Sequence, residues 1–299
     1  MTNLIIRDIH MILRSSILSI ASLWLTAISV NAQSDTIPFI LSDHNNLIIE
    51  TVINGVDSVE LMFHTDASGI ALIKSSTDSL VSIVWGEAGT AISWGGEHDS
   101  RMSANNSLSI GKLHWDSLGV FEDERSGPHT DGKFGPDLFE GKFIEVNFDQ
   151  GLLIISSTLS DQASNYEKCD LIIQNGSWFI EGTSKVGAEY KSLFLIHSGF
   201  GGTLLFDDEF VQKTELGTAI EIVDEQDLKD AFGNVIKTKK GVLPQFSIGS
   251  LTFEDLTVGF FDGAIGVQRM SIIGGDLLKR MNFIIDAKRE NIYIKRSIL

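Results

Sequence analysis

The chain has 299 residues, with 40 acidic and 23 basic side chains and a formal net charge of −17. This excess of negative charge argues against binding of nucleic acid or of an anionic membrane face, because both require a basic surface. The single cysteine, Cys169, excludes an intrachain disulfide, and we expect it to be a buried structural residue rather than a nucleophile.

The first 32 residues are typical of a secretory signal peptide. Arg7 and Arg14 give a basic start, residues 15–29 form an uncharged apolar run, and small residues up to Ala32 offer a cleavage site. We therefore expect cleavage after Ala32, export to a periplasm or to the outside, and no membrane span in the mature chain. Removing this segment, which carries one net positive charge, would leave a net charge of −18.

The mature chain is predicted to be all-β. Short runs rich in Ile, Val, Leu and Phe alternate with Gly, Asn and Asp, and Asn54-Gly55 between two such runs signals a hairpin. In chain order the expected strands are Ile37–Leu41, Ile48–Ile53, Val59–Phe63, Phe143–Phe148, Leu152–Ile155, Leu171–Ile173, Phe194–Ile196, Phe283–Ile285 and Ile292–Ile294. A further hairpin is expected within Val84–Glu97. The helical patterns are short, and the clearest are Asp137–Glu140, Asp207–Leu216 and Asp276–Met281.

An internal repeat predicts the architecture. His64 is followed 73 residues later by Asp137, and His197 is followed 79 residues later by Asp276. Each half has the same order: a loop after a strand, a long intervening segment, an apolar-Gly-x-Asp-Leu block, a short helix and two closing strands. We therefore expect two pseudo-symmetric β lobes, 33–160 and 161–299, with a cleft between them.

Two loops resemble those of a known family. Residues 61–69 (LMFHTDASG) and 194–203 (FLIHSGFGGT) each resemble an active-site loop of the pepsin-like and retropepsin-like aspartic proteases, of the kind secreted by bacteria. The family pattern is apolar residues, then Asp-Thr/Ser-Gly, then small residues. The resemblance covers roughly 37–295 and implies a bilobal pepsin-like fold. It also implies that His64 and His197 stand at the positions of the two catalytic aspartates.

These two replacements remove the chemistry that the resemblance implies. Aspartic proteases need two carboxylates that share one proton, whereas two facing imidazoles repel when both are charged. At least one of the two histidines should therefore be neutral near pH 7. Asp66 stands where the family has glycine, a place to which aspartate is poorly suited, and Gly199 holds the matching place in the second loop. No carboxylate pair can form, so we expect conventional aspartic proteolysis to be absent.

Three functions stay open from the sequence. The first is a pseudoprotease that binds a peptide or a protein partner in the interlobe cleft without cutting it. Its candidate binding residues are Thr65, Asp66, Ser68, Ser198, Gly199, Trp85 and Trp94, although the two tryptophans could instead pack between the lobes. The second is an atypical peptidase or hydrolase in which zinc, held by His64, His197 and Asp66, activates water. The third is an interaction domain whose cleft is closed. No other cofactor is expected, and the oligomeric state stays open.

Overall fold

The computed structural model describes residues 34–93, 96–229, 235–261 and 268–299. The expected signal peptide with its cleavage site at Ala32, and Trp94 of the expected hairpin, lie outside the described residues. No helix within the described ranges is long and apolar enough to cross a membrane.

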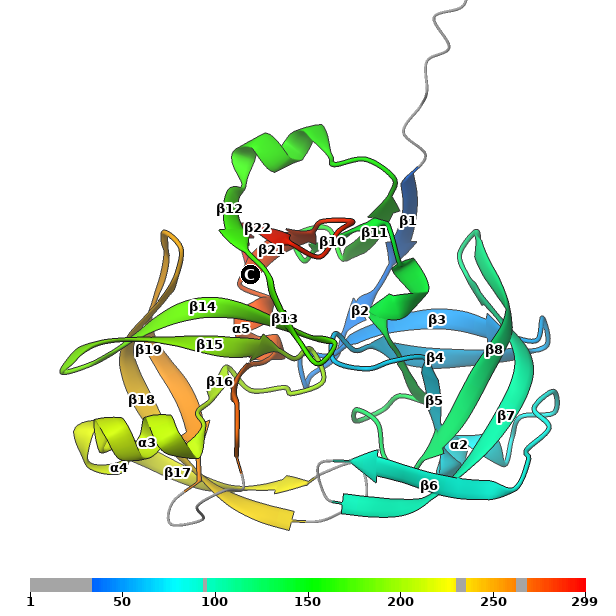
Figure 1. Ribbon diagram of the computed structural model, residues 1–299, viewed down its shortest axis with the longest axis horizontal. Helices are drawn as coiled ribbons and strands as arrows, with labels where there is room; N and C mark the ends of the chain where they lie inside the picture. Colours follow the sequence, from blue (N-terminus) through cyan, green and yellow to red (C-terminus); the bar gives the residue numbers. More distant parts are fainter. Residues whose placement is uncertain (1–33, 94–95, 230–234, 262–267) are drawn as a thin grey trace, which may run out of the picture. The chain divides into compact units, whose positions relative to one another are not determined.

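The described strands form three sheets (Figure 1). The first eight-stranded sheet has the order β2-β3-β4-β9-β5-β8-β7-β6. Its strands are β2 (Ile40–Leu41), β3 (Leu47–Ile53), β4 (Asp57–Phe63), β5 (Ile70–Ile73), β6 (Ala88–Ser93), β7 (Gly96–Ile110), β8 (Leu113–Asp123) and β9 (Gly132–Phe134). The second has the order β13-β14-β15-β20-β16-β19-β18-β17. Its strands are β13 (Ile172–Gln174), β14 (Ser177–Val186), β15 (Ala188–Ile196), β16 (Leu204–Leu205), β17 (Glu221–Lys229), β18 (Val235–Ile248), β19 (Leu251–Phe260) and β20 (Ser271–Ile273).

The two eight-stranded sheets repeat one topology. In the first, β4 runs parallel to β9, β9 runs antiparallel to β5, and β5 runs parallel to β8. In the second, β15, β20, β16 and β19 repeat these three pairings in the same order. Each sheet then ends in a long hairpin, β6–β7 in one and β17–β18 in the other. This repetition confirms the bilobal all-β fold that the sequence repeat predicts.

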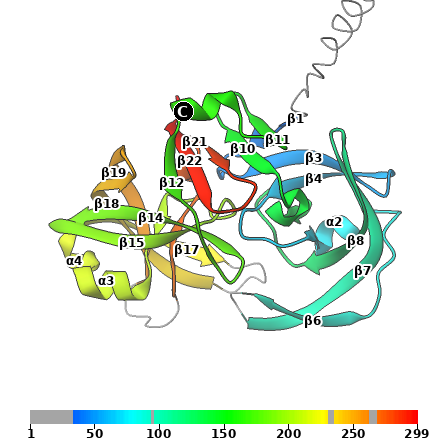
Figure 2. The ribbon, with the colours of Figure 1, turned by 45° about the horizontal axis from the view of Figure 1, so that its top comes forward.

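The closing strands of both repeats combine into a third sheet (Figures 1 and 2). Its order is β1-β11-β10-β21-β22-β12. The strands are β1 (Ser34–Pro38), β10 (Phe143–Asn147), β11 (Leu152–Ser156), β12 (Glu167–Asp170), β21 (Met281–Ile285) and β22 (Asn291–Arg296). The two repeats meet where β10 pairs with β21. There the buried Asn282 side chain accepts a hydrogen bond from the Phe148 N–H (2.7 Å) and donates one to Asp149 (2.7 Å).

Several predicted local signals are confirmed, and two are wrong. The expected strand Ile37–Leu41 is two strands in different sheets, β1 and β2. The expected helix Asp207–Leu216 is interrupted at Glu215, whose φ is positive (49°). Asn54 and Gly55 both have positive φ (52° and 67°), as a tight hairpin turn requires. The first segment of this helix begins at Asp208, and the carboxylate of its N-cap residue Asp207 accepts a hydrogen bond from the Phe210 N–H (2.8 Å). The helical segments are α2 (Lys74–Thr77), α3 (Asp208–Thr214), α4 (Leu216–Ala219), α5 (Gly275–Leu278) and the 3₁₀ turns η1 (Pro136–Phe139) and η2 (Asp161–Asn165).

The short strands β5, β9, β16 and β20 were not predicted, because two to four residues carry too little alternation to be recognised. The long strands β8, β14, β17, β18 and β19, and β7 beyond Glu97, were also absent from the predicted set.

Buried phenylalanines hold the strand ends that precede the two loops. The ring of Phe63, at the end of β4, lies 5.5 Å from that of Phe134 on β9. The ring of Phe194, on β15, lies 5.0 Å from that of Phe246 on β18. Burial of each such side chain stabilises the fold by roughly 1.5–3 kcal/mol. Each lobe therefore places its loop on a rigid support.

Cys169 is half-buried on β12 rather than fully buried. Burial, together with the nearby charges of Glu167 and Asp170, raises the pKa of its thiol to about 11. The thiolate needed for nucleophilic chemistry is therefore scarce at neutral pH, in keeping with a structural role.

Candidate functional site

The two loops begin where β4 and β15 end, and each is held by the parallel strand beside it. The His64 N–H donates to the Phe134 carbonyl (3.0 Å), and the His197 N–H donates to the Ile273 carbonyl (2.9 Å). A Cβ at Gly135 would lie 2.1 Å from the carbonyl oxygen of Ala67, so only glycine fits beside the first loop. A Cβ at Gly274 would likewise lie 2.3 Å from the Gly202 carbonyl oxygen. Both apolar-Gly pairs thus lie against their loops.

Reciprocal hydrogen bonds join the two loops. The Thr65 N–H donates to the Ser198 hydroxyl (3.0 Å), and the Ser198 N–H donates to the Thr65 hydroxyl (3.0 Å). The Thr65 hydroxyl donates to the Ile196 carbonyl (2.6 Å), and that of Ser198 donates to the Phe63 carbonyl (2.7 Å). Both side chains are buried, so each hydroxyl satisfies two backbone groups of loops that are far apart in the sequence.

The rings of His64 and His197 meet edge to face, with centroids 4.5 Å apart and planes at 68°. Nδ1 of His64 accepts a hydrogen bond from the Asp66 N–H (3.1 Å), and Nδ1 of His197 accepts one from the Phe200 N–H (2.9 Å). A backbone N–H can only donate, so neither Nδ1 carries a proton. Each neutral ring therefore carries its proton on Nε2.

Their surroundings keep both rings neutral. Burial and the neighbouring His197 lower the pKa of His64 well below 6.5, and the positive charge of Lys133 lowers it further. Burial also lowers the pKa of His197, where the negative charge of Asp66 acts in the opposite direction. Protonation of either Nδ1 would in addition set two N–H groups against each other. The pair is thus uncharged near neutral pH, as the sequence led us to expect for at least one ring.

The first loop accommodates Asp66 without strain, contrary to the expectation that aspartate suits this place poorly. Asp66 is not among the described residues with positive φ. Glycine is instead required at position 199, because a Cβ on Gly199 would lie 2.4 Å from Cδ2 and Nε2 of His64. The two loops are therefore not equivalent, because the His64 ring packs against Gly199 of the second loop.

A turn between β2 and β3 contributes residues that the sequence did not single out. The Asn45 amide donates to the Gly201 carbonyl (2.8 Å), and the buried Asn46 amide donates to the Ser198 carbonyl (3.0 Å). Lys279 in turn donates to the Asn45 side-chain oxygen (2.8 Å). The positive φ of Asn45 is typical of a turn. The sequence carries no signal that this turn forms hydrogen bonds with the loop of the other lobe.

The remaining candidates lie in different settings. Ser68 is exposed, whereas Trp85 is half-buried, packs against the hydrophobic core and has the Arg101 guanidinium 5.0 Å from its ring centroid.

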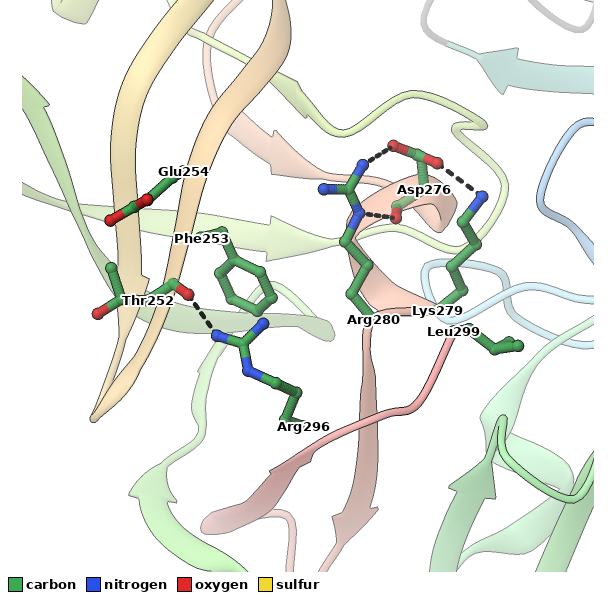
Figure 3. A pocket seen from close by; sticks show the side chains of 8 residues that line it. All are labelled: Thr252, Phe253, Glu254, Asp276, Lys279, Arg280, Arg296 and Leu299. Atoms are coloured by element: carbon green, nitrogen blue, oxygen red, sulfur yellow. Dashed lines mark hydrogen bonds and ion pairs between the residues drawn. The ribbon is translucent and has the colours of Figure 1, made fainter.

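A separate surface pocket of about 570 Å³ lies beside α5 (Figure 3). Its charged groups largely satisfy one another, since Asp276 binds both Lys279 (2.7 Å) and Arg280 (2.8 Å). None of the proposed site residues lines this pocket.

The histidine pair does not fit the requirements of a zinc site. A histidine that binds metal through Nε2 normally donates its Nδ1–H to a carbonyl or carboxylate. Here each Nδ1 faces a backbone N–H, so a metal at Nε2 would force two donors together. Among the described residues, no group of three His, Cys, Asp or Glu side chains is placed to hold a metal ion.

Zinc is therefore expected to leave the melting temperature of the protein unchanged. A ligand that binds the folded state at one hundred times its Kd would stabilise it by about 2.7 kcal/mol. The measurement is thermal unfolding with and without added zinc, with the same measurement on His114→Gln as a control for surface histidines. A rise of several degrees that is lost in His64→Gln would overturn this assignment.

Comparisons with known proteins show the fold. No protein-family model matches the sequence, and no curated protein matches it. Among solved structures, the aspartic proteinase from Irpex lacteus superimposes with a TM-score of 0.60 at 13% sequence identity. The match covers 89% of this chain and 98% of that one. The chain thus has the bilobal fold of a pepsin-like aspartic proteinase, and at this identity the likeness concerns the fold alone.

Proposed function

We propose that the protein is an exported, non-proteolytic relative of the aspartic proteases that binds an extended peptide, or an extended segment of a partner protein, between its lobes. His64 and His197 take the places of the two catalytic aspartates. The observation that carries the proposal is the backbone N–H donated to Nδ1 of each ring.

This observation argues against catalysis by the pair. Activation of water requires a group that accepts its proton, within hydrogen-bond reach. The only lone pair of each neutral imidazole already accepts a backbone N–H, and the other nitrogen carries a proton. Two carboxylates that share a proton offer both an acceptor and a donor, whereas these two rings offer donors alone.

Several features favour peptide binding. The reciprocal Thr65–Ser198 hydrogen bonds keep the loops in a defined arrangement although the pair lacks the means for proteolysis. The strands β6 and β17 stand at the outer ends of the two eight-stranded sheets. Edge strands offer backbone groups with which an extended peptide can pair.

The test is incubation of the purified protein with a diverse peptide library from acidic to mildly basic pH, read by mass spectrometry with and without a chelator. We expect no cleavage at any pH, and intact peptides retained on immobilised protein. His64→Gln is the matched variant, because it removes the imidazole and keeps a side-chain N–H. Cleavage that is lost in His64→Gln contradicts the proposal, and cleavage that a chelator abolishes points to the metal-dependent hydrolase instead.

A further inference from the structure

The pocket beside α5 has an excess of positive side chains in a chain whose net charge is −17. Its lining includes the cations Lys279, Arg280 and Arg296 and the acids Asp276 and Glu254 (Figure 3). Its volume of about 570 Å³ lies within the range of pockets that hold small organic molecules. Because one positive charge is left over, the pocket favours a ligand with a single negative charge.

Arg296 supplies the positive charge that no carboxylate of the protein binds. This last residue of β22 forms no ion pair with any described residue, whereas Lys279 and Arg280 share the carboxylate of Asp276. The Arg296 guanidinium donates a hydrogen bond to the Thr252 carbonyl and lies 4.8 Å from the centre of the buried Phe253 ring. The carbonyl and the ring both restrict its orientation, and most of its N–H donors remain available to a ligand.

Arg280 and Lys279 add to the positive charge of the pocket. Nε of Arg280 donates to the Asp276 carbonyl (3.2 Å), and one of its Nη atoms donates to the Asp276 carboxylate (2.8 Å). The Lys279 ammonium lies 2.7 Å from the same carboxylate. One negative charge therefore compensates two positive charges. The side chains of Arg280 and Lys279 are only 35% and 27% exposed, so solvent screens their charges less than it would on an open surface.

The segment that forms one wall of the pocket also holds the second loop. The N–H groups of Gly275 and Asp276 donate to the carbonyls of Phe200 (2.6 Å) and Gly202 (3.1 Å). Lys279 acts on the same loop through its hydrogen bond to the β2–β3 turn described above. A ligand in the pocket would therefore contact residues that fix the loop, and its binding can be followed in the backbone signals of these residues.

We infer that this pocket binds the carboxylate of a small organic acid. The Arg296 guanidinium donates hydrogen bonds to the carboxylate, because its planar group matches the two oxygens of a carboxylate. Arg280 and Lys279 attract it through the charge that Asp276 leaves uncompensated. The exposed carboxylate of Glu254 opposes an anion and favours a ligand of low charge. This site is separate from the histidine pair, so the inference holds whether or not a peptide binds between the lobes.

The first experiment compares benzoate with benzamide, which has nearly the same shape and no charge. Backbone N–H signals of the unmodified protein are followed by NMR during titration with each compound at constant ionic strength. We expect benzoate to shift the signals of residues 252–254 and of Arg296 and to bind about tenfold more tightly than benzamide. Equal affinity of the two compounds, or benzoate shifts spread over exposed lysines elsewhere, overturns the inference. Inorganic phosphate that binds at these residues tenfold more tightly than benzoate overturns the assignment to a carboxylate.

Matched variants locate the effect. Arg296→Met removes the charge, keeps most of the aliphatic stem over Phe253 and should weaken benzoate binding about tenfold. Glu254→Gln removes the opposing carboxylate and should strengthen binding about two- to fivefold. Lys191→Met changes the net charge as Arg296→Met does, at an exposed residue paired with Glu181 outside the pocket, and should bind as the unmodified protein does. A benzoate affinity that is unchanged in both Arg296→Met and Glu254→Gln overturns the inference.

The wall shared with the second loop gives an independent check. We expect benzoate to shift the N–H signals of Gly275 and Asp276 with the same concentration dependence as that of Arg296, and benzamide to have a much smaller effect. In Arg296→Met these shifts should require about tenfold more benzoate. Benzoate binding that leaves the Gly275 and Asp276 signals in place would put the ligand elsewhere on the protein and overturn the assignment to this pocket.

Discussion

Thr65→Val is expected to lower the melting temperature by about 4–24 °C. The valine keeps the volume of threonine but leaves the Ser198 N–H and the Ile196 carbonyl unpaired in a buried setting. Unpaired buried groups cost about 1–3 kcal/mol each, and one kcal/mol corresponds to about 2–4 °C in a chain of this size. The measurement is thermal and urea unfolding of the variant beside the unmodified protein.

The matching change in the other loop tests whether the two hydroxyls act as one unit. Ser198→Ala leaves the Thr65 N–H and the Phe63 carbonyl without their partner. In a double-mutant cycle we expect a coupling free energy of about 0.5–3 kcal/mol between the two sites. Thr51→Val is the control, because its buried hydroxyl makes one longer bond within its own lobe (3.2 Å to the Val59 carbonyl). Additive effects, or a Thr51→Val loss as large as that of Thr65→Val, would show that the reciprocal bonds are not special.

The free energy of unfolding is expected to fall as the pH drops below about 6.5, the pKa of an unperturbed histidine. The folded state holds His64 and His197 at lowered pKa values, so it binds fewer protons than the unfolded chain in this range. Stability therefore rises with pH through this window and is complete above the unfolded pKa. For each unit by which folding lowers the pKa of a histidine, the free energy of unfolding falls by about 1.4 kcal/mol once the pH is below both the unfolded and the folded pKa. Urea unfolding between pH 7.5 and 5 measures the effect.

Variants assign the effect to the pair. The double variant His64→Gln/His197→Gln should lose most of the slope between pH 6.5 and 5, whereas His114→Gln should keep it. A second loss of stability is expected in a lower range, below about pH 4.5. It arises at carboxylates whose pKa is lowered in the folded state. Glu122 is one of them, through its hydrogen bond and ion pair with Arg101, and the others are Asp57, Asp149, Asp276 and Asp286. A double variant with an unchanged slope above pH 5 would mean that other groups titrate there.

Local features of the sequence were enough to predict much of the fold. The turn at Asn54-Gly55, the cap at Asp207 and the closing strands depend on residues that are close together in the chain. The repeat at His64 and His197 predicted two lobes of one topology, because the same order of motifs builds the same pairings twice. The strands β9 and β20 escaped prediction because they are too short to show alternation, and the neighbours that stabilise them lie more than sixty residues away in the sequence.

The identity of the site residues was determined by the sequence, and their chemistry was decided by the tertiary structure. The replacement of both expected aspartates by histidine is visible in two nine- or ten-residue segments. Which nitrogen of each ring carries the proton depends on the direction of the Asp66 and Phe200 N–H groups, and this direction is set only when the loops are folded. The electrostatic effect of Lys133 on both rings likewise depends on the pairing of β9 with β4. Sequence patterns specify residue types, whereas hydrogen-bond direction and electrostatic surroundings arise only when distant segments pack together.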